Sequence, residues 1–127
     1  MSGAGDVSGA GDVSGDCLFC RIVAGDLPAS VVHGTEHSLA FRDLHPQAPV
    51  HVLVVPRRHI DDAAALGPGD GEALEDLFAT ARRVAELEGI AERGYRLLFN
   101  VGADAANSVP HLHLHVVGGR RLSWPPG

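Results

Sequence analysis

The stretch that decides the fold reads His111-Leu112-His113-Leu114-His115-Val116-Val117. Its alternation of imidazole and apolar side chains predicts a β-strand, because successive side chains of a strand point to opposite faces. All three histidines are then expected on one face, with neighbouring Cα atoms about 6–7 Å apart at a rise of about 3.3 Å per residue. The apolar face packs on the core, so the imidazole face is either solvated or used for chemistry.

Three interpretations of that histidine face compete. An exposed polar face that happens to be rich in histidine is the weakest, because three histidines in register are an improbable coincidence. A metal site is the second, since two imidazoles spaced His-x-His on a strand can bind one ion. The third is catalysis, in which a neutral imidazole attacks phosphorus while its neighbours hold its tautomer or supply a proton. The spacing alone favours metal binding and catalysis about equally.

Outward from this strand, the hydrophobic pattern predicts an α+β domain. The predicted strands span residues 31–34, 38–43, 50–55, 95–101 and 111–117. Apolar residues at helical spacing predict a short helix from Leu18 to Val23 and a long helix over residues 70–88. Because the strands come in pairs with the long helix between them, we expect a mostly antiparallel, five-stranded sheet.

Composition narrows the class of partner. The chain has 10 Lys and Arg against 16 Asp and Glu, a net charge of −6 with neutral histidines. Nucleic-acid binders usually carry a basic footprint, so we expect no nucleic-acid partner, although loop amides, helix N-termini and histidines can hold one mononucleotide phosphate. No run is apolar enough to cross a bilayer and no signal peptide is visible, so we expect no membrane contact and a cytoplasmic location.

The first residues form a direct repeat. Ser-Gly-Ala-Gly-Asp-Val occupies residues 2–7 and recurs at residues 8–13. This segment has almost no large apolar side chains to offset the cost of ordering it. We therefore predict a flexible tail over residues 1–15 and one domain over residues 16–127.

Neighbouring motifs decide between the metal and the catalytic interpretation. The histidine strand fits the motif His-φ-His-φ-His-φ-φ (φ, apolar) and resembles the histidine triad (HIT) family at every position. Phe41–His51 resembles the family stretch F-x-D-φ-x-P-x-A-P-x-H, and Val54–Ile60 resembles φ-φ-P-K/R-x-H-φ. Gly118–Arg120 with Trp124–Gly127 is similar to the Hint branch. The resemblance covers residues 16–127 and implies a HIT-like fold whose sheet continues across a homodimer.

The Hint resemblance implies a purine nucleoside phosphoramidase, which cleaves the P–N bond at the α-phosphate of AMP or GMP derivatives. His113 matches the nucleophile, which forms a nucleotidyl-histidine intermediate, and His115 matches the histidine that hydrogen-bonds the phosphate. The catalytic residues implied are His113, His115, Ser108, His51 and His111. The substrate-binding residues implied are Leu18, Phe19, Ile22, Phe41, Asp43, Leu44, Asn100, Ala106, Asn107, Ser108, His113, His115 and Trp124, the last reaching toward the partner subunit's site.

Cys17 and Cys20 depart from the usual Hint pattern. Other HIT proteins use such a pair with two histidines to bind zinc, and the matching histidines here are His51 and His111. Cys₂His₂ is a sound tetrahedral zinc set, and zinc there would make both histidines structural ligands instead of acid–base groups. The alternatives are two buried thiols that behave as small apolar residues, or redox chemistry, for which no thioredoxin-like context exists.

The loop before the triad also departs from the Hint pattern. Hint proteins usually have Gly-Gly-Gln-Ser, whereas this chain has Ala105-Ala106-Asn107-Ser108, and replacing glycine restricts positive φ angles. Two alternative functions stay open: a dinucleoside polyphosphate hydrolase, and a nucleotide- or zinc-binding regulatory module without turnover. His33, His37 and His45 are expected on the surface, and His59 is expected to pack or to cap a helix.

Overall fold

The computed structural model describes residues 17–127, so the predicted tail over residues 1–15 lies outside the described residues. Its core is one antiparallel five-stranded sheet with strand order β1-β2-β3-β5-β4. The elements are α2 (Leu18–Val23), β1 (Val31–Gly34), β2 (Ser38–Arg42), β3 (Val50–Pro56), α3 (Gly71–Leu87), β4 (Tyr95–Leu98) and β5 (Leu114–Gly118). Short 3₁₀ turns occupy Ala63–Ala65, Pro68–Asp70 and Ala103–Ala105. The predicted α+β architecture is confirmed.

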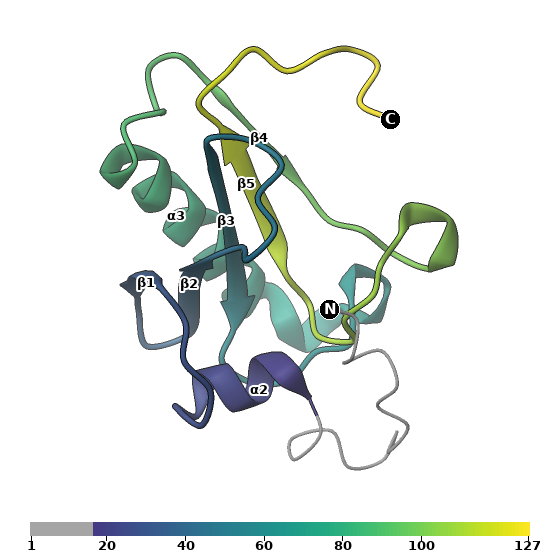
Figure 1. Cartoon of the computed structure of the whole chain (residues 1–127). Coiled ribbons are helices and arrows are strands. Elements are labelled where there is room, and N and C mark those ends of the chain that lie inside the picture. The colour runs from purple at the N-terminus through teal and green to yellow at the C-terminus, as the bar shows by residue number, and fades with distance from the viewer. Residues whose placement is uncertain (1–16) are drawn as a thin grey trace.

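Helix α3 covers one face of the sheet (Figure 1). Leu77, Ala81, Val84 and Ala85 follow the i, i+4, i+7, i+8 spacing of one helical face, and all four are fully buried. They pack on side chains that alternate along the two central strands. These are Val52 and Val54 of β3 and Leu114 and Val116 of β5. The prediction that the apolar face of the histidine strand packs on the core is therefore confirmed.

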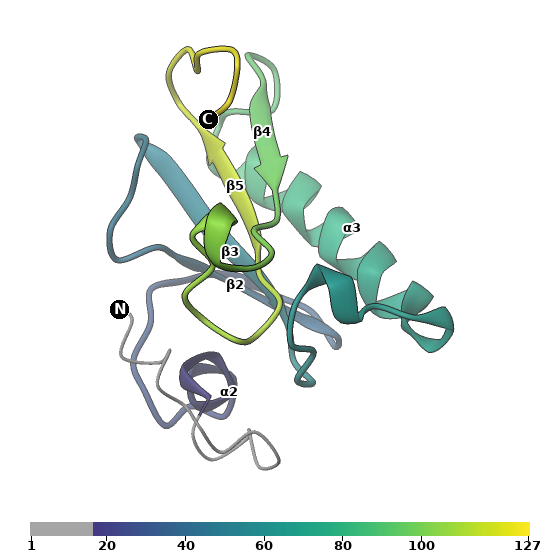
Figure 2. The same ribbon diagram turned by 90° about the vertical axis from the view of Figure 1, so that its right-hand side faces the viewer.

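The opposite face of the sheet carries a second, smaller core beneath α2. In Figure 2 the sheet lies between α2 and α3. Phe19 of α2 packs edge-on against Phe41 of β2, with ring centroids 5.4 Å apart. Leu53 and Val55 of β3 belong to the same cluster. A helix of six residues is too short to be stable by itself, so these contacts hold α2 on the sheet.

The histidine strand is shorter than predicted, because β5 begins at Leu114 instead of residue 111. The His111 amide donates to the Val109 carbonyl in a tight turn, and the Leu112 amide donates to the Ile60 carbonyl, outside the sheet ladder. His111 and Leu112 therefore lie outside the regular strand. The three histidines still lie on the α2 side of the sheet, since Phe19 of α2 packs against the rings of His111 and His113 and His115 lines the same pocket as His113. Between residues 17 and 127, no helix is long and apolar enough to cross a membrane.

Candidate active site and metal centre

A pocket of about 600 Å³ opens on the α2 side of the sheet. Helix α2, the segment that follows it and the end of β2 form a largely apolar wall, and the histidines of β3 and β5 lie at the polar end. Most of the predicted binding residues line it, namely Leu18, Phe19, Ile22, Phe41, Asp43, Leu44, Asn100, Ala106, Ser108, His113 and His115, together with His51. Leu27, Pro28 and Ala29 line it as well, and the sequence analysis missed them because irregular chain carries no periodic pattern.

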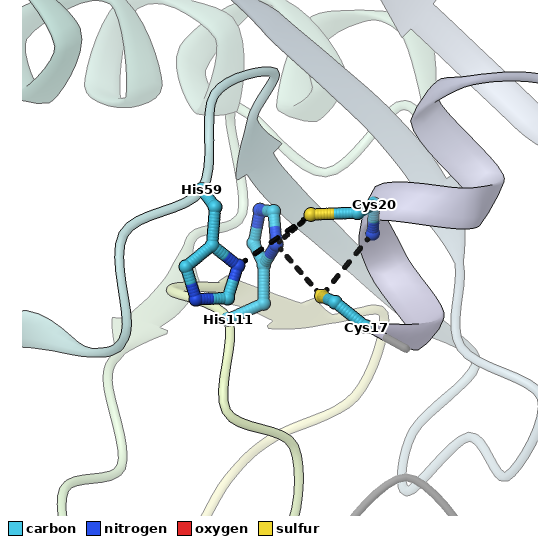
Figure 3. A group of neighbouring side chains, drawn as sticks. All are labelled: Cys17, Cys20, His59 and His111. Atoms are coloured by element: carbon cyan, nitrogen blue, oxygen red, sulfur yellow. Dashed lines mark hydrogen bonds between the residues drawn. The ribbon is translucent and has the colours of Figure 1, made fainter. Parts of the chain in front are cut away.

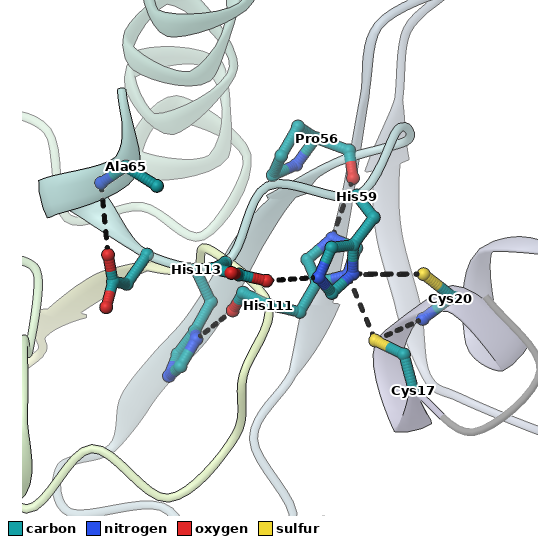
Figure 4. A network of polar contacts seen from close by, with 9 residues as sticks. Cys17, Cys20, Pro56, His59, Ala65, His111 and His113 are labelled. Atoms are coloured by element: carbon teal, nitrogen blue, oxygen red, sulfur yellow. Dashed lines mark hydrogen bonds and ion pairs between the residues drawn. The ribbon is translucent and has the colours of Figure 1, made fainter. Parts of the chain in front are cut away.

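His113 presents one ring nitrogen to this pocket. Its Nδ1 lies 2.7 Å from the carbonyl oxygen of His111, which can only accept, so Nδ1 carries the proton (Figure 4). Burial lowers the pKa of His113, which keeps the ring neutral near pH 7. Nε2 therefore keeps its lone pair, as a nucleophile requires.

His51 and His115 form a directed hydrogen-bonded pair at the polar end of the pocket. The Gln47 backbone amide donates to Nδ1 of His51 at 3.0 Å, so the proton of a neutral His51 sits on Nε2. That Nε2 lies 2.9 Å from Nδ1 of His115, which therefore accepts. The remaining proton of His115 then sits on its Nε2, which lies 3.4 Å from Nδ2 of Asn100. Because both of these atoms would donate, this tautomer requires the Asn100 amide to turn its oxygen toward His115.

Desolvation keeps this pair neutral. Burial, with a smaller contribution from His113 and His51, lowers the pKa of His115 to about 4. Burial also lowers the pKa of His51, against the opposing effect of the Asp43 carboxylate, whose Oδ2 lies 3.4 Å from Nε2. Both rings can thus act as hydrogen-bond relays near pH 7 without carrying a charge.

The two cysteines lie in a second cluster, behind the pocket. Cys17, Cys20, His59 and His111 point toward one another in Figure 3, and their ligand atoms all lie within 4.8 Å of one another. Nδ1 of His111 is 3.2 Å from Sγ of Cys17 and 3.5 Å from Sγ of Cys20. Nδ1 of His59 is 3.5 Å from Sγ of Cys20.

The tautomers of both histidines fit a metal ion. Nε2 of His111 donates to the Pro56 carbonyl at 3.0 Å, and Nε2 of His59 donates to the Asp61 carboxylate at 2.7 Å. Both Nδ1 lone pairs therefore face the sulfur atoms, and such outer partners are typical of zinc-ligating histidines. Two thiols and two imidazoles form a tetrahedral set that zinc prefers. Burial, with a smaller effect of the neighbouring Cys17 sulfur, raises the pKa of Cys20 to about 12, so a bound cation would displace its proton.

The predicted ligand set was wrong at one position, because His59 stands where His51 was expected. His51 lies at the start of β3, opposite Val117, whereas the cluster lies beyond the other end of β3. His51 does approach Asp43 and His115 within ligand distance, but its Nε2 carries a proton and offers no lone pair there. His59, which was expected to pack or to cap a helix, does pack edge-on against the His111 ring, with centroids 4.9 Å apart, and it also faces the cysteines. His111 was expected in the pocket but does not line it.

Comparisons with known proteins show the family to which the chain belongs. The sequence profile described as the HIT domain matches residues 24–122. The chain belongs to the HIT domain family. It is 43% identical to an uncharacterised HIT-like protein of Synechocystis over 88% of this chain and 97% of the relative.

Two solved structures are similar to this chain in both sequence and fold. A HIT family hydrolase of Legionella pneumophila has a TM-score of 0.85 at 46% identity, over 87% of this chain and 99% of that protein. A HIT family hydrolase of Clostridium thermocellum has a TM-score of 0.82 at 40% identity, over 84% of this chain and 93% of that protein.

The loop that precedes the triad contains one alanine, Ala106, in a backbone conformation that alanine disfavours. Ala106 has φ +62° and ψ +31°, a left-handed conformation that residues with a side chain rarely adopt, yet it lines the pocket beside Ser108. Asn107 does not line the pocket, and its buried Oδ1 has no hydrogen-bond partner within residues 17–127. Trp124 does not line it either and is 81% exposed.

Proposed function

We propose that this HIT domain hydrolyses purine nucleoside 5′-phosphoramidates, such as those of AMP and GMP, at the α-phosphate. The observation that carries the proposal is the free Nε2 of His113 at the polar end of an apolar slot, with the donor side of His115 in the same pocket. The names of the Legionella and Clostridium proteins, both HIT family hydrolases, support hydrolysis as the reaction class.

In the first step, Nε2 of His113 attacks the α-phosphorus. An N–P bond forms, the bond to the amine breaks, and the amine leaves with one proton gained. The ring becomes cationic because it keeps the proton on Nδ1, and the His111 carbonyl stabilises that charge. In the second step, water attacks phosphorus, the N–P bond breaks, and the proton lost in the first step is returned to its donor.

The proton for the amine is assigned to His115. Its ring is neutral in the free protein, since burial lowers its pKa to about 4. A bound phosphate anion would favour the imidazolium and raise that pKa toward neutrality. The added proton would enter at Nδ1 of His115, and Nε2–H of His51 would then donate to the Asp43 carboxylate, 3.4 Å away, instead of to His115. Ser108 lines the same pocket and is assigned to the leaving group. Substrate binding would thus bring the acid into its working protonation state.

Recognition of the nucleoside is assigned to the rest of the pocket. The purine would lie in the apolar slot formed by Leu18, Phe19, Ile22, Phe41 and Leu44. The Asp43 carboxylate offers two acceptors for the ribose hydroxyls, and the His45 backbone amide fixes it by donating to Oδ1 at 2.8 Å. The Asn100 side-chain amide would hold the phosphate.

The test is release of a fluorescent amine from an adenosine 5′-phosphoramidate. The wild-type protein should release the amine and His113→Ala should not, whereas His33→Ala, on strand β1 and outside the pocket, should match the wild type. Equal release by His113→Ala would overturn the proposal. Turnover of dinucleoside polyphosphates in place of phosphoramidates would favour the neighbouring HIT activity, and nucleotide binding without turnover would favour a regulatory module.

Zinc is proposed as the ion for Cys17, Cys20, His59 and His111. Thiolates and neutral imidazoles select zinc among common divalent ions, and the buried position suits a structural role. A bound zinc ion would stabilise the fold and would take no part in the reaction.

A homodimer is proposed with the β4 edge of the sheet as the interface. β4 lies at one end of the strand order, so a second copy can pair there and continue the sheet. Phe78 of α3 is 42% exposed and packs edge-on against Phe99, next to the equally exposed Val101, which gives that edge an apolar surface. Trp124 would then reach the partner subunit's pocket. A mass measurement in solution tests the dimer, and a cytoplasmic location stays a prediction.

A further inference from the structure

The chain that follows β5 returns along the loop that precedes β3. Gly119 has φ +91°, and a Cβ atom added to it would lie 2.9 Å from Cβ of Pro49. Only glycine permits both this conformation and this approach. The tight passage places the next residue, Arg120, against the loop that carries Gln47.

Arg120 and His51 bind the two polar backbone groups of Gln47. Nη2 of Arg120 donates to the Gln47 carbonyl at 3.0 Å, and the Gln47 amide donates to Nδ1 of His51 at 3.0 Å. The Gln47 side chain donates in turn to the His45 carbonyl at 2.9 Å, which closes the loop on itself. The backbone of one loop residue is therefore fixed between a cation on one side and a pocket histidine on the other.

The orientation of the Gln47 amide decides which hydrogen bonds the histidine pair can make. While that amide donates to Nδ1, His51 must carry its proton on Nε2, and His115 must present Nε2–H to the pocket, with the Asn100 amide turned so that its oxygen accepts. If the amide turns away, His51 can take the other tautomer, and the shared hydrogen bond reverses. His115 would then present a lone pair, which repels a phosphate oxygen instead of donating to it.

We propose that Arg120 is a positioning residue that holds the donor tautomer of the His51–His115 pair through the Gln47 backbone. Arg120 itself does not line the pocket, so it acts through the loop and not on the substrate. The effect of Arg120 on the reaction rests on the proposed function, in which Nε2–H of His115 faces the phosphate. The effect of Arg120 on the tautomers does not depend on that function.

The experiment compares the wild type with Arg120→Ala, Arg120→Lys and Arg121→Ala, all as full-length zinc-supplemented protein. Arg121 is the adjacent exposed arginine and offers only its carbonyl, to Arg120, so its variant is the matched control. ¹⁵N-labelled histidine NMR at pH 7.5 reads the tautomers of His51 and His115 in the ligand-free protein. Amine release from adenosine 5′-phosphoramidate reads kcat and KM separately.

We expect Arg120→Ala to give a mixture of His51 tautomers and to lower kcat about tenfold, the scale of one hydrogen bond, with little change in KM. Arg121→Ala should match the wild type, and Arg120→Lys should restore part of both signals because its ammonium can still donate to the carbonyl. Unchanged tautomers in Arg120→Ala overturn the inference, even if turnover falls. Shifted tautomers in a protein whose wild type releases no amine uphold the positioning role and reject the phosphoramidase proposal instead.

Discussion

The residue that orients His113 also belongs to the cysteine cluster: the carbonyl oxygen of His111 lies 2.7 Å from Nδ1 of His113, and the His111 side chain faces both sulfur atoms. Phe19, between the two cysteines in sequence, packs edge-on against both histidine rings, with centroids 5.9 Å and 5.2 Å away. Phe19 and His111 thus contact residues of both the cysteine cluster and the pocket, so a structural change in the cluster should also alter the pocket.

Removal of the metal should therefore weaken both the fold and nucleotide binding. A zinc ion that binds only the folded protein stabilises it by about 3 kcal/mol when free zinc exceeds the Kd a hundredfold. We expect a chelator to lower Tm and to weaken AMP binding, because α2 loses an anchor. Metal content, thermal unfolding and calorimetric AMP titration on the same samples test this.

The His59→Ala variant separates the metal from the pocket. His59 is a ligand in the cluster but does not line the pocket, so its loss should copy the effect of the chelator. A protein that purifies without zinc, and whose Tm is the same with and without chelator, would refute the metal assignment.

Acid should destabilise the protein partly through His115. Its pKa is about 4 in the native state, mainly because of burial, against an ordinary value of 6.5. Between pH 6.5 and pH 4 His115 is therefore protonated in the unfolded chain but neutral in the native state. The free energy of unfolding consequently falls as the pH drops from about 6.5 to 4. The full contribution is on the order of 3 kcal/mol at neutral pH.

Urea unfolding at pH 7 and pH 5 measures this contribution when the wild type is compared with His115→Gln. Glutamine does not titrate, so the variant should lose about 2 kcal/mol less between the two pH values than the wild type. Effects of pH on the metal cluster are common to both proteins and cancel in the difference. Equal losses would mean that His115 takes up its proton equally in both states.

The loop before the triad should gain stability from a glycine. Ala106 at φ +62° costs about 1–2 kcal/mol in backbone strain, and Ala106→Gly removes it while adding a smaller entropy to the unfolded chain. We expect a net gain of up to about 1 kcal/mol in urea unfolding. Ala105→Gly, in the 3₁₀ turn one residue earlier, is the control and should destabilise. If both variants are less stable to urea than the wild type, Ala106 is not strained in the native protein.

The sequence predicted the sheet and the helices because each has a local pattern, and most of the pocket lining followed from the resemblance to the HIT motifs. It misassigned one zinc ligand because two of the histidines that precede the triad, His51 and His59, lie at opposite ends of β3. That strand has seven residues, so its ends lie roughly 20 Å apart at about 3.3 Å per residue. The register that places His51 opposite Val117 also brings the start of β5 to the end of β3, where His59 lies. Only a correct strand pairing, which no single motif reveals, distinguishes the two.

The length of the histidine strand was overestimated for a related reason. Strict alternation over residues 111–117 predicts one strand, but the amides of His111 and Leu112 bond to Val109 and Ile60 instead of a neighbouring strand. Tertiary hydrogen bonds of this kind leave no trace in the hydrophobic pattern, so the start of β5 at Leu114 could not be foreseen from alternation.

Asp43 should determine whether the pocket discriminates ribose from sugars without hydroxyls. Its carboxylate is held between the His45 amide, at 2.8 Å, and Nε2 of His51, at 3.4 Å, and it can accept from two hydroxyls at once. Asp43→Asn keeps the size of the side chain but leaves one acceptor, so AMP should bind about tenfold more weakly, the scale of one hydrogen bond. Binding of 2′,3′-dideoxy-AMP, which has no hydroxyl to offer, should hardly change. Calorimetric Kd values for both nucleotides and both proteins give the coupling energy between Asp43 and the ribose hydroxyls directly. An equal loss for the two nucleotides would place the role of Asp43 in supporting His51 instead of in binding the sugar.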